Sequence, residues 1–232
     1  MFKNITHVFF DLDHTLWDFE TNSREALDEI FQIFELGQKR VRSAIDFIHV
    51  YERINENMWA GYRDGSISKN TLRKDRFPRA LAAFNINDDK LAQEINDYYL
   101  SHSPLKSNLF DHAHTTLDYL KSKYKMYIIT NGFEEVQNVK MKGSDLDRYF
   151  EKVITSEMVG VRKPDPKIFD FALSEANAKS EFSVMIGDDL IADVLGGQKA
   201  GMKGVFFNPT EKKHMEQIDK EIACLSELKT FL

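Results

Sequence analysis

Runs of apolar residues recur along the chain and predict buried β-strands. Their near-continuous apolar character, without alternation, is typical of strands covered on both faces, as in a parallel sheet. Segments with apolar residues at helical spacing separate the later runs, so the pattern predicts a doubly wound α/β domain with a parallel sheet. The predicted strands are residues 7–10 (HVFF), 126–130 (MYIIT), 152–155 (KVIT), 184–187 (VMIG) and 204–207 (GVFF).

The segment between the first two predicted strands follows a different pattern. Apolar positions repeat at helical spacing over residues 23–36, 47–62 and 90–102, and no convincing strand interrupts them. An all-helical block inserted after the first strand of an α/β domain predicts a second, smaller domain. The predicted boundaries are 18–100 for the helical domain, and 1–17 with 101–232 for the α/β core.

The composition narrows the classes of function. The chain has 232 residues, 42% hydrophobic and 29% charged, which is the balance of a globular protein. A formal net charge of -6 disfavours a nucleic-acid polymer as partner, because gripping its phosphates needs a basic surface. The sequence contains no run of about eighteen apolar residues, so no membrane span is predicted. Asp11 and Asp13 interrupt the N-terminal apolar run, so a signal peptide is not expected either. With Cys224 as its single cysteine, the chain suits a reducing compartment, and a cytoplasmic location is expected.

Polar side chains follow four of the predicted strands. In a parallel α/β sheet the carboxyl ends of the strands meet at one edge, where ligands bind. Carboxylates that lie close together at such an edge raise the free-energy cost of ionising one another. Several of them in one place therefore predict a cation that they share. The candidates are Asp11, Asp13, Thr130, Asn131, Arg162, Lys163, Asp188, Asp189 and Asp193.

This set of side chains suits phosphoryl transfer. Mg²⁺ prefers oxygen ligands, and Asp11, Asp188 and a main-chain carbonyl could supply them. Asp11 could attack phosphorus and form an aspartyl-phosphate. Asp13, two residues on, could protonate the leaving group and later deprotonate the hydrolytic water. The phosphoryl oxygens would be held by Thr130, Asn131 and Lys163.

The order of these motifs resembles that of the haloacid dehalogenase superfamily. Asp-x-Asp-x-Thr at 11–15, Thr-Asn at 130–131, Lys-Pro at 163–164, and Gly-Asp-Asp at 187–189 with Asp193 match its four motifs at strand ends. The resemblance spans nearly the whole chain. It implies a Rossmann-like core with a C1-type helical cap. The second aspartate of the first motif is similar to the phosphatases, whereas true dehalogenases lack it and need no magnesium.

Four further stretches look like the bacterial pyrimidine 5′-nucleotidase branch. They are residues 58–65 (MWAGYRDG), 129–133 (ITNGF), 159–173 (VGVRKPDPKIFDFAL) and 193–201 (DVLGGQKAG). This resemblance implies hydrolysis of nucleoside 5′-monophosphates, pyrimidine or non-standard, with Mg²⁺ as cofactor. It also places the main-chain carbonyl of Asp13 on the metal and gives auxiliary roles to Thr15, Asp189 and Asp193. One departure is Asp111–His112, where relatives often carry Pro-Gly before the second-motif helix.

Several candidate residues have a simpler structural interpretation beside the functional one. Asp189 suits a helix N-cap better than a metal ligand, and Arg162 suits a loop cation or an ion-pair partner. Trp17 and Phe19 could stack on a substrate base or could pack between the domains. Trp59 favours packing.

Three classes of function remain open at this point. The first is a magnesium-dependent phosphomonoesterase acting on nucleoside monophosphates, a small-molecule phosphate ester, as a monomer or weak homodimer. The second keeps the same chemistry for a sugar phosphate or phosphoglycolate, or as a phosphomutase, since the cap decides what enters. The third is a catalytically silent binding protein. The presence of Asp11, Asp13, Lys163 and Asp188 together argues against the third.

Overall fold

The computed structural model describes residues 2–232, which form two compact units. One unit consists of the chain up to Phe19 together with Ser107–Leu232, and the other of Glu20–Lys106. The first boundary lies two residues beyond the predicted one (19 against 17) and the second six residues beyond it (106 against 100). The second difference arises because the last long helix of the insert continues into a short 3₁₀ turn, Ser103–Leu105.

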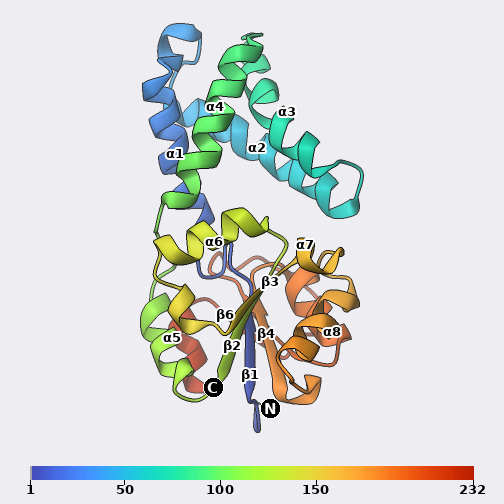
Figure 1. The fold of residues 1–232 in the computed structure, drawn as a ribbon. Coiled ribbons are helices and arrows are strands. Elements are labelled where there is room, and N and C mark those ends of the chain that lie inside the picture. Colours follow the sequence, from blue (N-terminus) through green and yellow to red (C-terminus); the bar gives the residue numbers. More distant parts are fainter. Residues whose placement is uncertain (1) are drawn as a thin grey trace. The chain divides into compact units, whose positions relative to one another are not determined.

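Six parallel strands form the sheet of the first unit, in the order β3-β2-β1-β4-β5-β6 (Figure 1). The five predicted strands are confirmed, with one added residue at the start of three of them. The sixth, at the edge, was not predicted from the sequence. The bounds are His7–Phe10 for β1, Lys125–Thr130 for β2, Lys152–Thr155 for β3, Ser183–Gly187 for β4, Lys203–Phe207 for β5 and Lys220–Ile222 for β6.

Each face of the sheet is covered by helices. Successive residues of a strand point to opposite faces, and accordingly Val8 and Phe10 belong to one buried cluster while Phe9 belongs to another. Helix α5 packs in the first cluster and α8 in the second, on the two sides of the sheet in Figure 1. The strands are therefore apolar throughout because neither face meets water. The helices of this unit are α5 (Ala113–Lys121), α6 (Glu134–Gly143), α7 (Ser156–Val159), α8 (Pro166–Glu175) and α9 (Gly196–Lys199), with a π-helical turn (Leu190–Leu195) and 3₁₀ turns at Asp147–Tyr149, Ser180–Phe182 and Leu225–Thr230.

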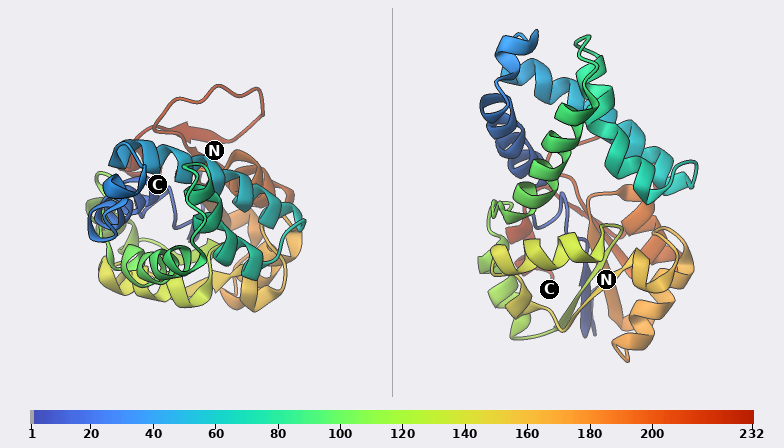
Figure 2. Two further views of the ribbon diagram at one scale, coloured as in Figure 1. Left: turned by 90° about the horizontal axis from the view of Figure 1, so that it is seen from above. Right: turned by 45° about the horizontal axis from the view of Figure 1, so that its top comes forward.

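The second unit is all-helical (Figure 2). It has its own hydrophobic core. Three of its helices begin at side-chain caps, where Ser43, Ser68 and Asp88 each accept a hydrogen bond from a main-chain N–H three residues on. Among the described residues, no helix combines the length and apolar character that a bilayer span requires. The bounds are Phe19–Ile33 for α1, Ala44–Asp64 for α2, Lys69–Ala82 for α3 and Asp89–His102 for α4, with a 3₁₀ turn at Leu36–Lys39.

The register of the central strands decides where the polar motifs lie. Phe10 of β1 is level with Ile128 of β2 and with Ile186 of β4. The three strands therefore run out at the same edge, and the Asp11 N–H donates to the Ile186 carbonyl at 2.9 Å. Side chains that follow these strands are brought together by the sheet itself.

Candidate active site

A buried lysine lies between two aspartates at this edge. The Lys163 Nζ is 2.6 Å from Asp11 Oδ1 and 2.6 Å from Asp193 Oδ1, and it donates to the Ile129 carbonyl at 2.7 Å. Burial alone would lower the pKa of Lys163, but the two carboxylates outweigh burial and raise the pKa above its usual range. The lysine is therefore a fixed positive charge, held by residues that are 152 and 30 positions away in sequence.

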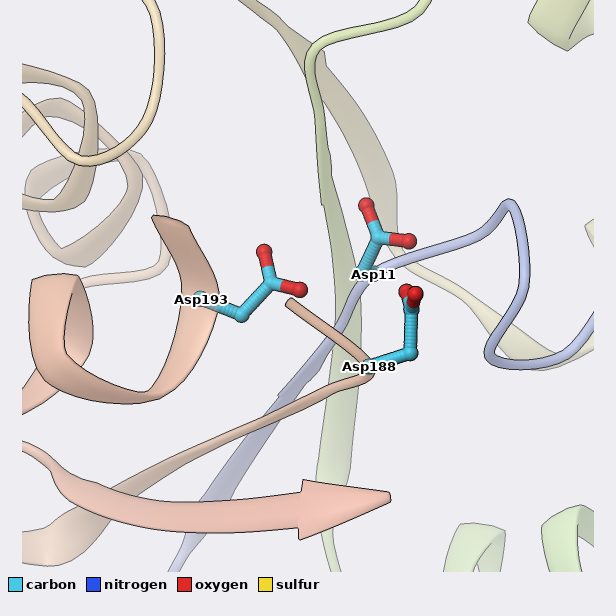
Figure 3. Close-up of side chains that lie close together, drawn as sticks. All are labelled: Asp11, Asp188 and Asp193. Atoms are coloured by element: carbon cyan, nitrogen blue, oxygen red, sulfur yellow. The ribbon is translucent and has the colours of Figure 1, made fainter. Parts of the chain in front are cut away.

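Three carboxylates converge at this edge of the sheet, two of them the partners of Lys163. Figure 3 shows the side chains of Asp11, Asp188 and Asp193. Each of Asp11, Asp188 and Asp193 offers an oxygen, and these atoms all lie within 4.8 Å of one another. Burial raises the pKa of Asp11 to about 7, with the Asp193 charge adding to it and Lys163 opposing it. Burial and the neighbouring Asp11 likewise raise the pKa of Asp188. One lysine does not balance three carboxylates, so the cluster favours binding of a further positive charge.

The hydrogen bonds of the cluster distinguish which carboxylates suit a metal. Asp193 uses both oxygens within the protein, because Oδ1 pairs with Lys163 and Oδ2 accepts the Asp189 N–H at 3.0 Å. Asp11 meets Lys163 through Oδ1, and Asp188 accepts from the Thr15 hydroxyl through Oδ1 at 3.2 Å. Among the contacts of the described residues, neither the Oδ2 of Asp11 nor the Oδ2 of Asp188 is used in a hydrogen bond or ion pair, so both oxygens remain available to a ligand. Two such oxygens in a buried acidic cluster fit a hard divalent cation such as Mg²⁺.

Thr15 fixes Asp188 from two directions. Its hydroxyl donates to the Asp188 carboxylate and also accepts the Asp188 N–H at 3.1 Å. The threonine of the first motif thus orients the aspartate of the fourth, 173 residues away.

Asp189 has a different task from its neighbour. Its Oδ1 accepts hydrogen bonds from the N–H groups of Ile191 at 3.0 Å and Ala192 at 2.9 Å. Asp189 is therefore the N-cap of the π-helical turn Leu190–Leu195, which matches the simpler interpretation of the sequence.

Asp13 is held by two residues of α6 that the sequence did not single out. Lys140 Nζ lies 2.5 Å from Asp13 Oδ1, and Gln137 Nε2 donates to Asp13 Oδ2 at 2.8 Å. Burial alone would raise the pKa of Asp13, but the Lys140 charge and the hydrogen bonds from Lys140 and Gln137 outweigh it and lower the pKa. The available signal was the polar pair Gln137 and Lys140 at helical spacing soon after the second motif.

The second motif supports the loop that carries Lys163. Asn131 makes two hydrogen bonds to the Lys163 main chain, accepting from its N–H at 2.8 Å and donating to its carbonyl at 3.1 Å. The Thr130 hydroxyl oxygen accepts from the Gly132 N–H at 3.0 Å and from Gln137 at 2.8 Å. The side chain of Asn131 is therefore engaged in holding the loop.

The aromatic candidates lie in packed surroundings. Trp17 is fully buried in the cluster around α5, and its ring meets that of Phe19 edge-on with centroids 6.1 Å apart. The Lys140 ammonium lies 4.1 Å from the centre of the Trp17 ring, a cation–π contact. Trp59 stacks edge-on against Tyr62 in the helical unit. This burial favours the packing role of Trp17 over base stacking.

Arg162 precedes Lys163 in the same loop. Its main-chain carbonyl accepts the Asp165 N–H at 2.8 Å, and Asp165 in turn caps α8 by accepting the Lys167 N–H at 2.9 Å. These contacts give the loop a defined turn between Lys163 and the helix that follows it.

Comparisons with known proteins agree on one family of hydrolases. Residues 5–201 match the family model of haloacid dehalogenase-like hydrolases. Over 229 residues the chain is 33% identical to the pyrimidine 5′-nucleotidase YjjG of Escherichia coli, covering 97% of this chain and 96% of that one. It is 32% identical over 206 residues to the pyrimidine 5′-nucleotidase PynA of Streptococcus pneumoniae, covering 87% and 83%. The crystal structure of the HAD-hydrolase YfnB of Bacillus subtilis, described as bound to magnesium, superposes with a TM-score of 0.87 at 26% identity over 98% of both chains.

Proposed function

This chain belongs to the haloacid dehalogenase-like hydrolase family, and we propose that within it the protein hydrolyses pyrimidine nucleoside 5′-monophosphates with Mg²⁺ as cofactor. The family and its 5′-nucleotidase relatives make it a phosphoric monoester hydrolase acting on small phosphate esters. The observation that carries the proposal is the convergence of Asp11, Lys163 and Asp188 at the ends of the parallel strands. Support for the nucleotide comes from the two relatives named as pyrimidine 5′-nucleotidases.

The residues that would hold Mg²⁺ are Asp11 and Asp188 through their carboxylates and Asp13 through its main-chain carbonyl. The bound ion would offset negative charge on the phosphoryl oxygens and on the two carboxylates. Asp193 would not bind the ion directly, since both of its oxygens are already engaged by Lys163 and Asp189. Its part is to hold Lys163 in place.

Asp11 is proposed as the nucleophile. In the first half of the reaction, the bond from an Asp11 oxygen to phosphorus forms while the bond from phosphorus to the ester oxygen breaks. Asp13 gives its proton to that departing oxygen. In the second half, a water oxygen bonds to phosphorus, the bond to Asp11 breaks, and the proton of the water passes to Asp13. Asp11 and Asp13 thus end the cycle as they began it.

The phosphoryl oxygens are proposed to meet Lys163 and the second motif. Lys163 carries a permanent charge at 2.6 Å from Asp11 and can offset charge that develops next to the nucleophile. Thr130 accepts the two hydrogen bonds described for its hydroxyl, which leaves its hydrogen to donate to a phosphoryl oxygen. For Asn131 the contact is proposed through the main-chain N–H, because its side chain is engaged with the Lys163 main chain.

A panel of phosphate esters tests this function. UMP, dUMP and dTMP, several sugar phosphates and phosphoglycolate are assayed for phosphate release with Mg²⁺ and again with EDTA. The proposal expects the highest kcat/KM for the pyrimidine nucleotides and loss of turnover in EDTA. If sugar phosphates turn over well while nucleotides are ignored, the nucleotidase assignment is wrong. If EDTA has no effect, the assignment of the cofactor is wrong.

A further inference from the structure

Helix α6 buries polar side chains and exposes an apolar one. Gln137 is fully buried and Lys140 is 5% exposed, whereas Val139, on the same helix, is 38% exposed. An amphipathic helix that packed only for stability would show the reverse arrangement. Burying an ammonium costs free energy unless it is paired. The buried polar residues of this helix are therefore explained by the groups that they contact.

What it contacts is Asp13. Lys140 and Gln137 each take one of the two carboxylate oxygens, at 2.5 and 2.8 Å. Gln137 also donates to Thr130 at 2.8 Å, so the same amide joins the first motif to the second. The carboxylate is thereby held at both oxygens by two partners from one helix.

The lysine is itself fixed. Its ammonium lies 4.1 Å from the Trp17 ring centre and 5.4 Å from that of Phe19. A cation held against aromatic faces keeps less rotational freedom than a solvated lysine, which makes it a rigid support for its carboxylate partner. The aromatic residues just past the first motif thus have a use that does not require contact with substrate.

We propose that Lys140 and Gln137 are positioning residues that clamp the Asp13 carboxylate for proton transfer, with Trp17 and Phe19 steadying Lys140. The inference rests on the proposed function, in which Asp13 exchanges protons with the leaving group and the hydrolytic water. A clamped carboxylate meets the reacting oxygen without a search among rotamers, and this ordering is a component of the rate. Releasing the clamp slows proton transfer while Asp11, Lys163 and Asp188 keep their contacts.

The test uses Lys140→Met, which keeps most of the side-chain volume and removes the charge. Lys140→Arg restores a donor, and Lys142→Met, at an exposed lysine of the same helix, is the matched control. The substrate is p-nitrophenyl phosphate, whose leaving group departs without protonation. Pre-steady-state kinetics then separate phosphorylation of the enzyme, seen as a burst of p-nitrophenol, from its hydrolysis, which sets the later steady rate.

The clamp predicts a selective effect on the second step. For Lys140→Met the burst rate stays within about twofold of wild type, while the steady rate falls about 10- to 100-fold. Lys140→Arg recovers part of the loss and Lys142→Met shows none. The steady rate is divided by the burst amplitude, which counts the folded active sites. A role in folding alone would lower the burst amplitude and leave this corrected steady rate at the wild-type value, and that result would overturn the inference.

A second measurement reads the clamp without any assay of activity. Crystal structures of the wild type and Lys140→Met show whether Asp13 keeps its rotamer. The inference expects the carboxylate to turn away or to become disordered, and an unmoved Asp13 contradicts it. Failure of the nucleotidase proposal is recognised separately, because it would leave p-nitrophenyl phosphate turnover and the Asp13 rotamer intact while nucleotides are not hydrolysed.

Discussion

The side chains of Asp11 and Asp13 are two residues apart and have opposite electrostatic surroundings. Burial and nearby carboxylates raise the pKa of Asp11 to about 7, whereas Lys140 and Gln137 outweigh burial and lower that of Asp13. The proposed roles need an ionised Asp11 and a protonated Asp13 in the first half of the reaction. The positive charge of the cation beside Asp11 and the negative charge of the phosphate beside Asp13 must therefore shift both pKa values when they bind. Here the difference arises from the partners: Asp11 shares its lysine with a second aspartate, and Asp13 has one to itself.

The raised pKa of Asp11 predicts a pH dependence of stability in the metal-free protein. The unfolded chain has an ordinary Asp pKa of about 3.9, so between that value and about 7 the folded state binds more protons than the unfolded state. This contribution to stability is fully present below the unfolded pKa and is lost as the pH rises through the folded pKa. We expect the free energy of unfolding, measured with urea in EDTA, to fall by about 2–3 kcal/mol more in wild type than in Asp11→Asn between about pH 5 and about pH 8.

The comparison with Asp11→Asn is needed because other carboxylates act in the opposite sense. Asp13, Asp219 and Glu221 have lowered pKa values, and their contribution to stability is lost as the pH falls. Asp219 and Glu221 do not interact with Asp11, so their contributions cancel in the difference between the two proteins. The charge of Asp13 is one of the causes that raise the pKa of Asp11, so its contribution is part of the difference measured. If the free energy of unfolding depends on pH in the same way in both proteins, Asp11 has an ordinary pKa in the folded state and the prediction is wrong.

The strands and helices bring the candidate active-site residues together, and most of these elements were predicted from the sequence. The strands ending at Phe10, Thr130 and Gly187 were predictable because a strand buried on both faces is apolar throughout, and the carboxylates that follow them stood out. The edge strand β6 was not predictable, since two of its three residues are charged and exposed. Only Ile222 carries the apolar signal.

The contribution of α6 could not be read from the sequence either. The hydrophobic pattern identifies the face of a helix that packs on a core, and here the buried face carries Gln137 and Lys140. Their partner Asp13 lies more than 120 residues earlier, and only the tertiary fold brings the two together. A local rule of burial is broken where the helix meets a candidate catalytic group, which is where such exceptions are expected.

At the scale of the π-helical turn Leu190–Leu195, the capping role of Asp189 can be tested. Asp189→Ala removes the acceptor for two N–H groups and should lower the free energy of unfolding by about 1 kcal/mol. The Mg²⁺ concentration that gives half-maximal activity should change little, because Asp189 is not expected to bind the ion. Urea unfolding and a Mg²⁺ titration of activity check the two parts.

Two matched variants complete this experiment. Asp189→Ser keeps a capping oxygen and should restore most of the stability. Asp188→Asn, one residue earlier, should raise the Mg²⁺ requirement strongly. If Asp189→Ala raises it as much as Asp188→Asn does, Asp189 is a metal ligand and the capping account is incomplete.

The whole molecule joins an α/β unit that carries the proposed chemistry to a helical unit inserted after its first strand. The α/β unit brings together three carboxylates whose negative charge one lysine does not balance. The folded protein therefore has a cation-binding site that the unfolded chain does not have. Ligands that bind only the native state stabilise it by mass action. The metal should therefore be visible in the stability of the entire protein.

We expect Mg²⁺ to raise the melting temperature of the protein relative to EDTA. At about a hundredfold excess over Kd, the stabilisation should be about 2.7 kcal/mol. Asp188→Asn should lose most of the increase, whereas Asp170→Asn, at an exposed carboxylate of α8, should keep it. Differential scanning calorimetry of the three proteins measures this, and an equal increase in all three would place the ion elsewhere.

The covalent step on Asp11 is the claim on which the account depends most, and rapid acid quenching during turnover of UMP measures it directly. Mass spectrometry of the quenched, digested enzyme should find one phosphoryl group on the peptide that contains Asp11, appearing before phosphate is released. Asp11→Asn should remain folded, carry no such group and lose at least about 10³-fold in kcat. Phosphate release without any phosphorylated enzyme, or a phosphoryl group on another residue, would contradict the account.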